Sequence, residues 1–322
     1  MTTSSSPSPR SGSPTSRSVA DSLSAHRWRK RRPASGSLHE TGSDRRAGQD
    51  RPRRNGLRCR RQQRRSFGPS AASVYDQWWD FRQWSASAEL TGDSPFDPER
   101  ADAPSPEPRQ IFAIGLNYRA HQIESGFAEP SEPMVFTKFL SSVAGPVGEL
   151  TLFTDEVDWE VEAAVVIGVT AYRVSAEDAW KHVAGITAAQ DFSARDVQMR
   201  PVGTPQFSLG KSFPGFTPMG PALVTPDEFD DVNAIPVRCV INDVVVQEST
   251  TADLIFSVPQ LIAYLSAVLP LLPGDVILTG TPAGVGLGRN PKKYLVAGDS
   301  VVTTVGDQTL HHTAIEIPTE ES

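Results

Sequence analysis

The sequence predicts an α+β fold, a mixed β-roll or β-sandwich with a few covering helices. Strand-like segments outnumber helix-like ones and do not alternate with them strictly, which argues against a doubly wound parallel sheet. The chain has 322 residues, 38% of them hydrophobic, so it is long enough for a sizeable core. No run of about 18 apolar residues occurs, which excludes a membrane-spanning helix.

Charge divides the chain into two parts. Residues 1–66 contain 17 Lys and Arg against 4 Asp and Glu, whereas the remainder contains 14 against 34. The segment 1–70 is rich in Ser, Pro and Gly and nearly free of periodic apolar positions, so we predict a disordered Arg/Ser/Pro-rich extension. The acidic remainder argues against nucleic acid as the main partner.

The basic composition of this extension leaves three interpretations. It is typical of an arm that binds nucleic acid or directs nuclear import, and of a mitochondrial transit peptide. Pro and Gly interrupt every amphipathic helix there, which argues against the transit peptide. We favour an extension without function, because the charge changes sign abruptly and no chemical motif reaches into it.

A small N-terminal helix and a Pro-rich linker are predicted over 71–109. The helix is indicated within 73–90 by apolar residues at helical intervals: Val74, Trp78, Phe81 and Trp84. Residues 92–109 then carry the Pro-rich linker. We expect the helix to cover the main, catalytic domain, which is predicted over 110–322.

The catalytic domain reads as many strands with a few helices. Apolar runs and alternating patterns predict strands at 110–118, 133–140, 157–169, 185–196, 274–286, 296–307 and 308–317. The segment 236–247 alternates as a hairpin about Asn242-Asp243. Helical patterns occur at 119–125, 175–183 and 257–271.

Two glutamates and one aspartate suggest a metal site. Glu160 and Glu162 are two residues apart in a predicted strand and therefore share a face, with Val161, Ala163 and Val165 on the other. Paired carboxylates repel one another unless a cation lies between them, although a solvated strand face is the simpler interpretation. Asp191 follows an apolar strand and supplies the third oxygen ligand that Mg²⁺ or Mn²⁺ requires.

Other residues fit the chemistry of an acidic substrate. Lys211, flanked by apolar residues and a glycine, fits either a cation aimed at a carboxylate or enolate, or a lysine that extends from a strand into solvent. His121 and Glu124 are three apart on a helix and could together activate water, or simply form an exposed helix pair. The glycine-rich segment 280–286 lacks the ending of a phosphate loop. Cys59 and Cys239 cannot supply a disulfide framework or a Cys-rich zinc site.

Seven segments in order resemble the fumarylacetoacetate hydrolase family: IGLNYRAH, FTKFLSS, DWEVEAAVVIG, QDFSARDVQ, GKSFPGFTPMGP, INDVVVQESTTADLIFS and GDVILTGTPAGVG. They span roughly residues 110–316. The resemblance implies a mixed β-roll catalytic domain, usually paired as a homodimer. It also implies that Glu160, Glu162 and Asp191 bind Mg²⁺ or Mn²⁺.

The same resemblance implies further roles. Lys211 would be the catalytic lysine, and His121 with Glu124 a water-activating dyad carried on a lid. Four residues match positions that contact the keto-acid end of the substrate: Lys138, Arg195, Gln198 and Thr281. Pro214 departs from the pattern, because an Asp is common there.

The function implied is divalent-metal-dependent hydrolysis of a C–C bond in a 2,4-diketo acid of the acylpyruvate or fumarylpyruvate type, through a stabilised enolate. Alternatives on the same fold are oxaloacetate decarboxylation, and isomerisation or hydration of hydroxymuconate-type intermediates of aromatic catabolism. A different class is a non-catalytic nucleic-acid-binding protein that uses the basic N-terminal arm. We predict a cytoplasmic homodimeric enzyme that acts on a small 2-oxo or diketo acid, without nucleic-acid or membrane partners.

Overall fold

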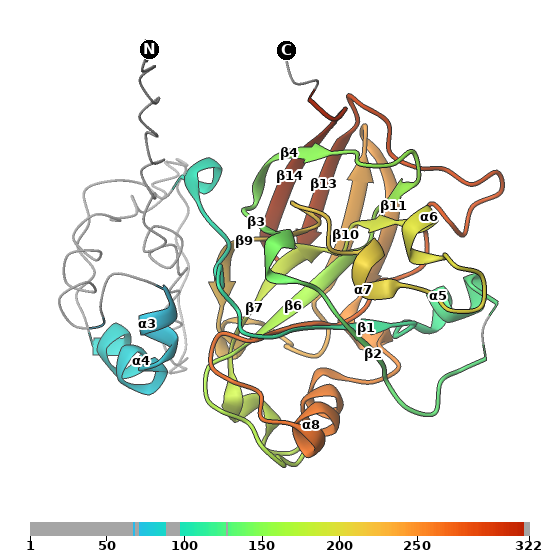
Figure 1. Cartoon of the computed structure of the whole chain (residues 1–322). Coiled ribbons are helices and arrows are strands. Elements are labelled where there is room, and N and C mark those ends of the chain that lie inside the picture. Colours follow the sequence, from blue (N-terminus) through green and yellow to red (C-terminus); the bar gives the residue numbers. More distant parts are fainter. Residues whose placement is uncertain (1–66, 68–70, 88–96, 127, 319–322) are drawn as a thin grey trace, which may run out of the picture.

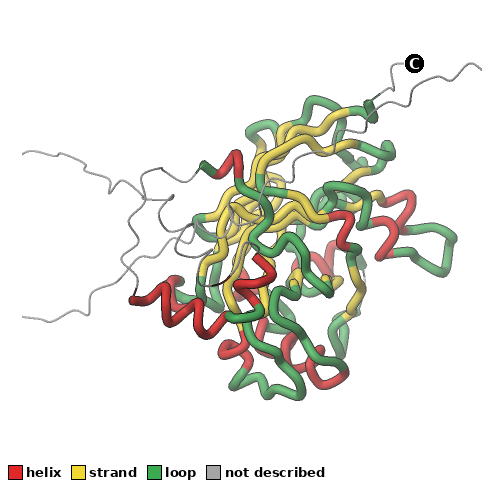
Figure 2. Tube along the Cα trace, turned by 60° about the vertical axis from the view of Figure 1, so that its left-hand side comes forward, coloured by secondary structure: helices red, strands yellow, loops and turns green. Residues whose placement is uncertain are grey.

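The computed structural model describes residues 67, 71–87, 97–126 and 128–318 (Figure 1). Apart from Phe67, the predicted extension 1–70 lies outside the described residues. Within them, mixed sheets and few helices confirm the predicted α+β class. Figure 2 shows the strands gathered at the centre of the molecule, with most helices towards the outside.

The largest sheet has seven strands in the order β2-β1-β12-β6-β7-β9-β3. Their bounds are β1 (Ile111–Gly115), β2 (Met134–Thr137), β3 (Val143–Ala144), β6 (Val161–Ile167), β7 (Val183–Gln190), β9 (Thr217–Val224) and β12 (Val276–Leu278). β1 runs parallel to β12 and β3 parallel to β9, whereas the other neighbours are antiparallel.

A second sheet of five strands has the order β11-β10-β13-β14-β4. Its strands are β4 (Val147–Thr151), β10 (Pro236–Ile241), β11 (Val244–Thr250), β13 (Ser300–Val305) and β14 (Gln308–Ile315). A short antiparallel pair joins β5 (Val157–Asp158) to β8 (Ser193–Ala194).

The described helices are short. They are α3 (Ala71–Tyr75), α4 (Trp78–Ser87), α5 (Arg119–Glu124), α6 (Arg195–Gln198), α7 (Phe207–Gly210) and α8 (Val258–Val268). Single 3₁₀ turns occur at η1 (Pro98–Arg100), η2 (Leu140–Ser142), η3 (Ala179–His182), η4 (Pro226–Glu228) and η5 (Thr251–Asp253). Among these described helices, none has the length and apolar character needed to cross a bilayer.

The two faces of β6 pack against different partners. Val161, Ala163 and Val165 face a core shared with the five-stranded sheet, as the alternation of the sequence predicted. Ala164 and Val166 belong to a second cluster that includes the aromatic side chains of α4. Glu162 has the same parity as these two residues, so the site and the second cluster lie on the same face of the large sheet.

The N-terminal aromatic residues cover part of that face. A Cβ at Gly168 would lie 2.5 Å from Cδ1 of Trp78, so only glycine allows this close contact. Two short helices, α3 and α4, replace the single helix predicted over 73–90. Phe67 is buried with its ring edge-on to that of Phe81 at 5.5 Å, so apolar packing begins inside the segment predicted as an extension.

Most predicted elements are present, and the differences have local causes. Asn242 and Asp243 adopt φ of 48° and 66° between β10 and β11, which confirms the hairpin. The helix predicted over 175–183 is reduced to the 3₁₀ turn η3. The sequence patterns did not indicate β9, because its two prolines and its glycine are unusual within a strand.

Candidate active site

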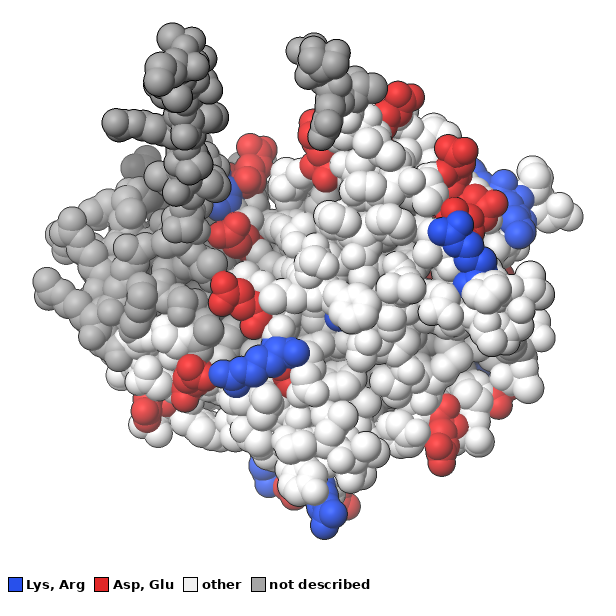
Figure 3. All heavy atoms as spheres, in the orientation of Figure 1, with Lys and Arg blue, Asp and Glu red and all other residues white. Residues whose placement is uncertain are grey.

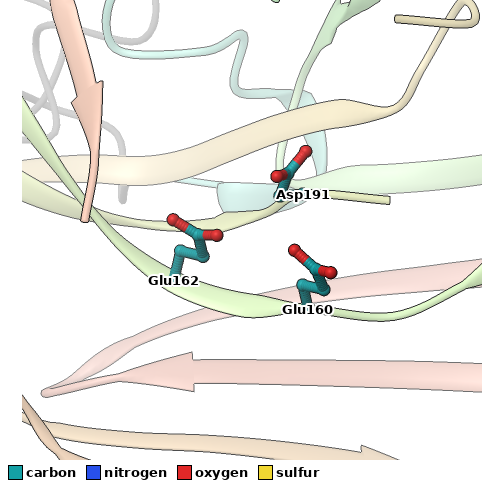
Figure 4. Close-up of side chains that lie close together, drawn as sticks. All are labelled: Glu160, Glu162 and Asp191. Atoms are coloured by element: carbon teal, nitrogen blue, oxygen red, sulfur yellow. The ribbon is translucent and has the colours of Figure 1, made fainter. Parts of the chain in front are cut away.

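Three buried carboxylates meet at one end of the large sheet (Figure 4). Glu162 lies in β6, Glu160 just before it, and Asp191 directly after the neighbouring strand β7. The antiparallel register pairs Val161 with Gln190, and this places Asp191 beside the two glutamates. One oxygen from each carboxylate lies within 4.8 Å of the others.

Hydrogen bonds fix this junction between the two strands. The amide of Asp191 donates to the Glu160 carbonyl at 2.9 Å. The amide of Glu160 donates in turn to Oε1 of Gln190 at 2.8 Å. Oε2 of Glu162 accepts from the amide of Gly280, at the start of the glycine-rich loop, at 2.6 Å. The backbone therefore holds the carboxylates together although they repel one another.

Two buried lysines contact the carboxylates. Lys211 Nζ lies 2.6 Å from both Glu160 and Asp191. Lys138 binds Asp191 and also donates to the Phe216 carbonyl at 2.8 Å. Lys211 and Lys138 are both almost fully buried, so neither is the solvent-exposed lysine that the simpler interpretation of Lys211 required.

The carboxylates differ in their electrostatic environment. Burial raises the pKa of Glu160, but the charges of Lys211 and Arg195 outweigh it and bring that pKa down to about 2. Burial raises the pKa of Glu162 well above its usual value, and the negative charges of Asp191 and Glu160 raise it further. Glu162 is thus the carboxylate whose negative charge is least compensated.

The lysines also differ. Burial alone would lower the pKa of Lys211, but Asp191 and Glu160 outweigh it and raise that pKa above its ordinary value. The pKa of Lys138 is lowered, because burial and the charge of Lys211 together outweigh its attraction to Asp191. Burial and nearby carboxylates act on both lysines, but the net effect raises the pKa of Lys211 and lowers the pKa of Lys138.

The donor set fits a hard divalent cation. All three groups are carboxylates, and oxygen-only ligation is typical of Mg²⁺ and Mn²⁺ rather than zinc. Glu162 lacks a cationic side-chain partner within the described residues. A divalent ion at this position would supply the charge that this carboxylate lacks.

α5 lies over the glycine-rich loop that follows β12. His121 Nδ1 lies 3.2 Å from Glu124 Oε2, and the amide of Gly284 donates to Glu124 at 3.1 Å. A Cβ at Gly288 would lie 2.6 Å from Glu124 Cδ, so the close packing requires glycine there. His121 is buried. These two residues are therefore not the exposed helix pair of the simpler interpretation.

The remaining residues named from the sequence lie in the same region. Arg195 donates to Glu160 at 2.6 Å and to Oε1 of Gln198 at 2.8 Å. Thr281 Oγ1 accepts from Gln247 Nε2 at 2.8 Å. Pro214, the departure from the family pattern, is exposed. Cys239 is a buried free thiol whose pKa is raised by burial to about 12, which makes it unreactive, and Cys59 lies outside the described residues.

Two residues of the site were not identified from the sequence. Asp158 accepts from Arg195 Nε at 2.8 Å and from the amides of Gly286 and Leu287 at 2.6 and 2.9 Å. It lies two positions before Glu160, so the same alternation could have revealed it. Gln247 reaches the site from the second sheet, and nothing in its local sequence indicated this role.

Comparison with known proteins places these residues in a shared framework. Residues 110–315 match the family model described as the fumarylacetoacetate (FAA) hydrolase C-terminal domain. A mitochondrial oxaloacetate tautomerase of Homo sapiens is 47% identical over 201 residues, which cover 62% of this chain and 64% of that protein. The chain thus matches slightly less than two thirds of that relative's length. The corresponding mitochondrial protein of Xenopus laevis is 46% identical over 201 residues, 62% of this chain and 63% of that protein.

Solved structures show the same likeness. A candidate HpcE protein from Mycobacterium smegmatis is 44% identical with a TM-score of 0.77, and the match covers 80% of this chain and 92% of that one. The fumarylpyruvate hydrolase of Pseudomonas aeruginosa, solved with Mn²⁺ and pyruvate, is 28% identical with a TM-score of 0.59. That match covers 65% of this chain and 91% of that one.

The comparisons correct one prediction and settle the family. The human and frog relatives are mitochondrial by name, which contradicts the cytoplasmic location predicted from the sequence. The matched region holds every residue that the sequence proposed for the site, from His121 to Thr281. With a family model that covers most of the chain and a solved relative of the same architecture, the chain belongs to the fumarylacetoacetate hydrolase family.

Proposed function

We propose that the protein interconverts the keto and enol forms of a short 2-oxo dicarboxylic acid of the oxaloacetate class. The observation that carries the proposal is the group of three carboxylates with Lys211 and Arg195 beside it, a site suited to an enolate. The relatives named as oxaloacetate tautomerases support this substrate class over the acylpyruvates predicted first.

Glu160, Glu162 and Asp191 would hold the divalent cation. When bound, such an ion acts as a Lewis acid that favours negative charge on nearby substrate oxygens. Lys211 would add a fixed positive charge beside the same oxygens. Asp158 holds the Arg195 guanidinium, so Arg195 would be oriented in advance for a substrate carboxylate.

His121 is the residue that we assign to proton transfer. Glu124 accepts the Nδ1–H, which leaves the Nε2 lone pair free to take a proton. In tautomerisation a C3–H bond breaks and an O–H bond forms, so no atoms or electrons are gained or lost. Nε2 would take the proton from C3 and return it to the enolate oxygen.

Hydrolysis of an acylpyruvate is the second candidate. The pairing of His121 with Glu124 also suits a water molecule as proton donor, and the similarity to a fumarylpyruvate hydrolase supports this chemistry. In that reaction water adds to the distal carbonyl and the C–C bond breaks to release an enolate. Decarboxylation of oxaloacetate needs no attacking water and is a third outcome of the same assays.

The test follows the enol absorbance of oxaloacetate with Mg²⁺ or Mn²⁺, in parallel with pyruvate release from an acylpyruvate and CO₂ release from oxaloacetate. We expect enol conversion to be the fastest reaction. His121→Ala should slow it by about 10²- to 10⁴-fold, the usual contribution of a general base. Glu124→Gln should have a milder effect, because it keeps the shape and removes only the charge.

His311→Ala is the matched control, because this histidine is exposed on β14. It should keep wild-type rates. The proposal is wrong if the metal-loaded wild type converts the enol no faster than the chelator-treated protein. Faster acylpyruvate cleavage would instead select the second candidate.

The homodimer stays a prediction. Phe139 and Leu140, both half exposed at and beside η2, are apolar side chains that a second copy could cover. Light scattering on the purified protein measures the mass directly, and a monomer at micromolar concentration would contradict the prediction.

A further inference from the structure

Gln247 connects the second sheet to the site. It lies on β11 and is 2% exposed. Its Oε1 accepts from the amide of Val161, the residue between the two glutamates, at 3.0 Å. Its Nε2 donates to the Pro282 carbonyl and to Thr281 Oγ1, both at 2.8 Å.

These partners fix the orientation of the amide. A backbone N–H can only donate and a carbonyl can only accept, so Val161 and Pro282 define which end of Gln247 is oxygen and which is nitrogen. The Nε2 amide group can only donate, so Thr281 Oγ1 must accept from it. Within the part of the chain that the structure describes, no acceptor binds the Thr281 hydroxyl proton.

Thr281 directly follows the residue that binds one of the carboxylates. Gly280, the preceding residue, donates its amide to Glu162 at 2.6 Å, and Thr281 itself is 3% exposed. A hydroxyl free to rotate can present either its proton or a lone pair. A substrate carboxylate offers only acceptors, so a presented lone pair would repel it.

We propose that Gln247 is a positioning residue that makes Thr281 a hydrogen-bond donor toward the carboxylate of a 2-oxo acid. The inference rests on the proposed function, because it assumes that the substrate is a 2-oxo acid. Gln247 occupies one lone pair of Oγ1 before the substrate arrives, so the proton of Thr281 remains for the ligand. Gln247 acts through Thr281 and does not touch the substrate.

The test is a double-mutant cycle of Gln247→Glu and Thr281→Val on the Mn²⁺-loaded full chain. An ionised glutamate only accepts, so it would take the Thr281 proton and reverse the hydrogen bond. The readouts are pyruvate affinity by calorimetry, Mn²⁺ affinity and the midpoint of thermal unfolding. None of these requires turnover.

We expect Gln247→Glu and Thr281→Val each to weaken pyruvate binding by about 10- to 100-fold, the usual effect of a hydrogen bond to a charged group. In the Thr281→Val background, Gln247→Glu should cause no further loss of pyruvate affinity. Mn²⁺ affinity should change less than pyruvate affinity. Thr281→Ser, which keeps the hydroxyl, should retain wild-type affinity.

Two controls separate this role from a structural one. Gln83→Glu adds the same charge on the exposed face of α4 and should leave pyruvate affinity unchanged. If Gln247→Glu does not fold, Gln247→Met replaces it in the cycle, because it removes the donor without adding charge.

Three results would overturn the inference. They are additive losses of pyruvate affinity in the double variant, wild-type pyruvate affinity in Thr281→Val, and no pyruvate binding by the wild type. A wild type that binds pyruvate with the expected coupling but does not convert oxaloacetate would contradict the proposed function alone.

Discussion

Glu162 differs from the other two carboxylates in how its charge is balanced. Glu160 contacts Lys211 and Arg195, and Asp191 contacts Lys211 and Lys138. In the described structure Glu162 forms no salt bridge: it accepts from the Gly280 amide, and burial together with the charges of Asp191 and Glu160 raises its pKa more than the charge of Lys211 lowers it. This imbalance is unfavourable for the metal-free protein and favourable for binding a cation.

Glu162→Gln should separate these two consequences. Glutamine keeps an acceptor for Gly280 and removes the uncompensated charge, so the metal-free variant should be at least as stable as the metal-free wild type. A metal at 100 times its dissociation constant stabilises the wild type by about 2.7 kcal/mol, and the variant should lose that gain. Thermal unfolding with and without Mn²⁺ measures both.

Glu149→Gln is the matched control, because Glu149 is exposed on β4. It should keep the full stabilisation by Mn²⁺. If Glu162→Gln gains as much from Mn²⁺ as the wild type does, Glu162 is not a ligand.

Residue types and short spacings in the sequence predicted many residues of the candidate site. The separation of Glu160 and Glu162 follows from the period of a strand, and that of His121 and Glu124 from the turn of a helix. Gln247 could not be found in this way, because its partner Val161 lies 86 positions away and Thr281 lies 34. Contacts over such distances depend on how two sheets pack together, which no local pattern encodes.

Among the elements, the hairpin between β10 and β11 was predicted most directly. Its two turn residues both have positive φ, which Asn and Asp tolerate and glycine prefers. β9 shows the opposite case, because tertiary pairing with β7 overrides a sequence that contains two prolines. Local propensity thus determines the turn between β10 and β11, whereas tertiary packing determines strand β9.

Asp243→Gly should stabilise the protein. Asp243 is exposed with φ of 66°, a conformation that costs glycine nothing, so we expect a gain of about 0.5–1 kcal/mol in the free energy of unfolding. Asp243→Val should be destabilising, because a β-branched residue is strained there. Denaturant unfolding of the three proteins gives the order, and a valine variant as stable as the glycine variant would contradict this reasoning.

His312 bears on the stability of the whole molecule. It lies on β14, where its Nε2 donates to the Gly145 carbonyl at 3.2 Å in the segment between β3 and β4. Burial lowers its pKa from the ordinary 6.5 to about 4. Nδ1 has no hydrogen-bond partner among the described residues, so a proton there would have no acceptor.

Stability should therefore fall as the solution is acidified. Between pH 6.5 and 4 the unfolded chain binds a proton at His312 that the folded chain does not, so protonation favours unfolding. The contribution is complete above pH 6.5 and decreases by about 3 kcal/mol as the pH falls to 4. Unfolding free energies over this pH range measure it.

His312→Gln offers the comparison. Glutamine can keep a donor toward Gly145 and does not titrate, so its unfolding free energy should depend less on pH across the same range. His311→Gln, on the exposed neighbour, should follow the wild type. If the unfolding free energies of wild type and His312→Gln changed with pH in parallel, groups other than His312 would cause the acid sensitivity.

The charges on one face of the molecule are mixed in sign. On the face drawn in Figure 3, the described Lys and Arg residues are scattered among Asp and Glu and form no broad basic patch. The basic segment that suggested a nucleic-acid arm lies in 1–66, outside the described residues.

The aromatic cover and the carboxylates occupy one face of the same sheet but come from different parts of the sequence. The carboxylates lie within the family match of 110–315, whereas Trp78 and Phe81 precede it. The candidate site thus comes from the matched strands, whereas the aromatic cover of the same face comes from the segment before them. A substitution in that segment would therefore alter the cover of this face while the three carboxylates stay unchanged.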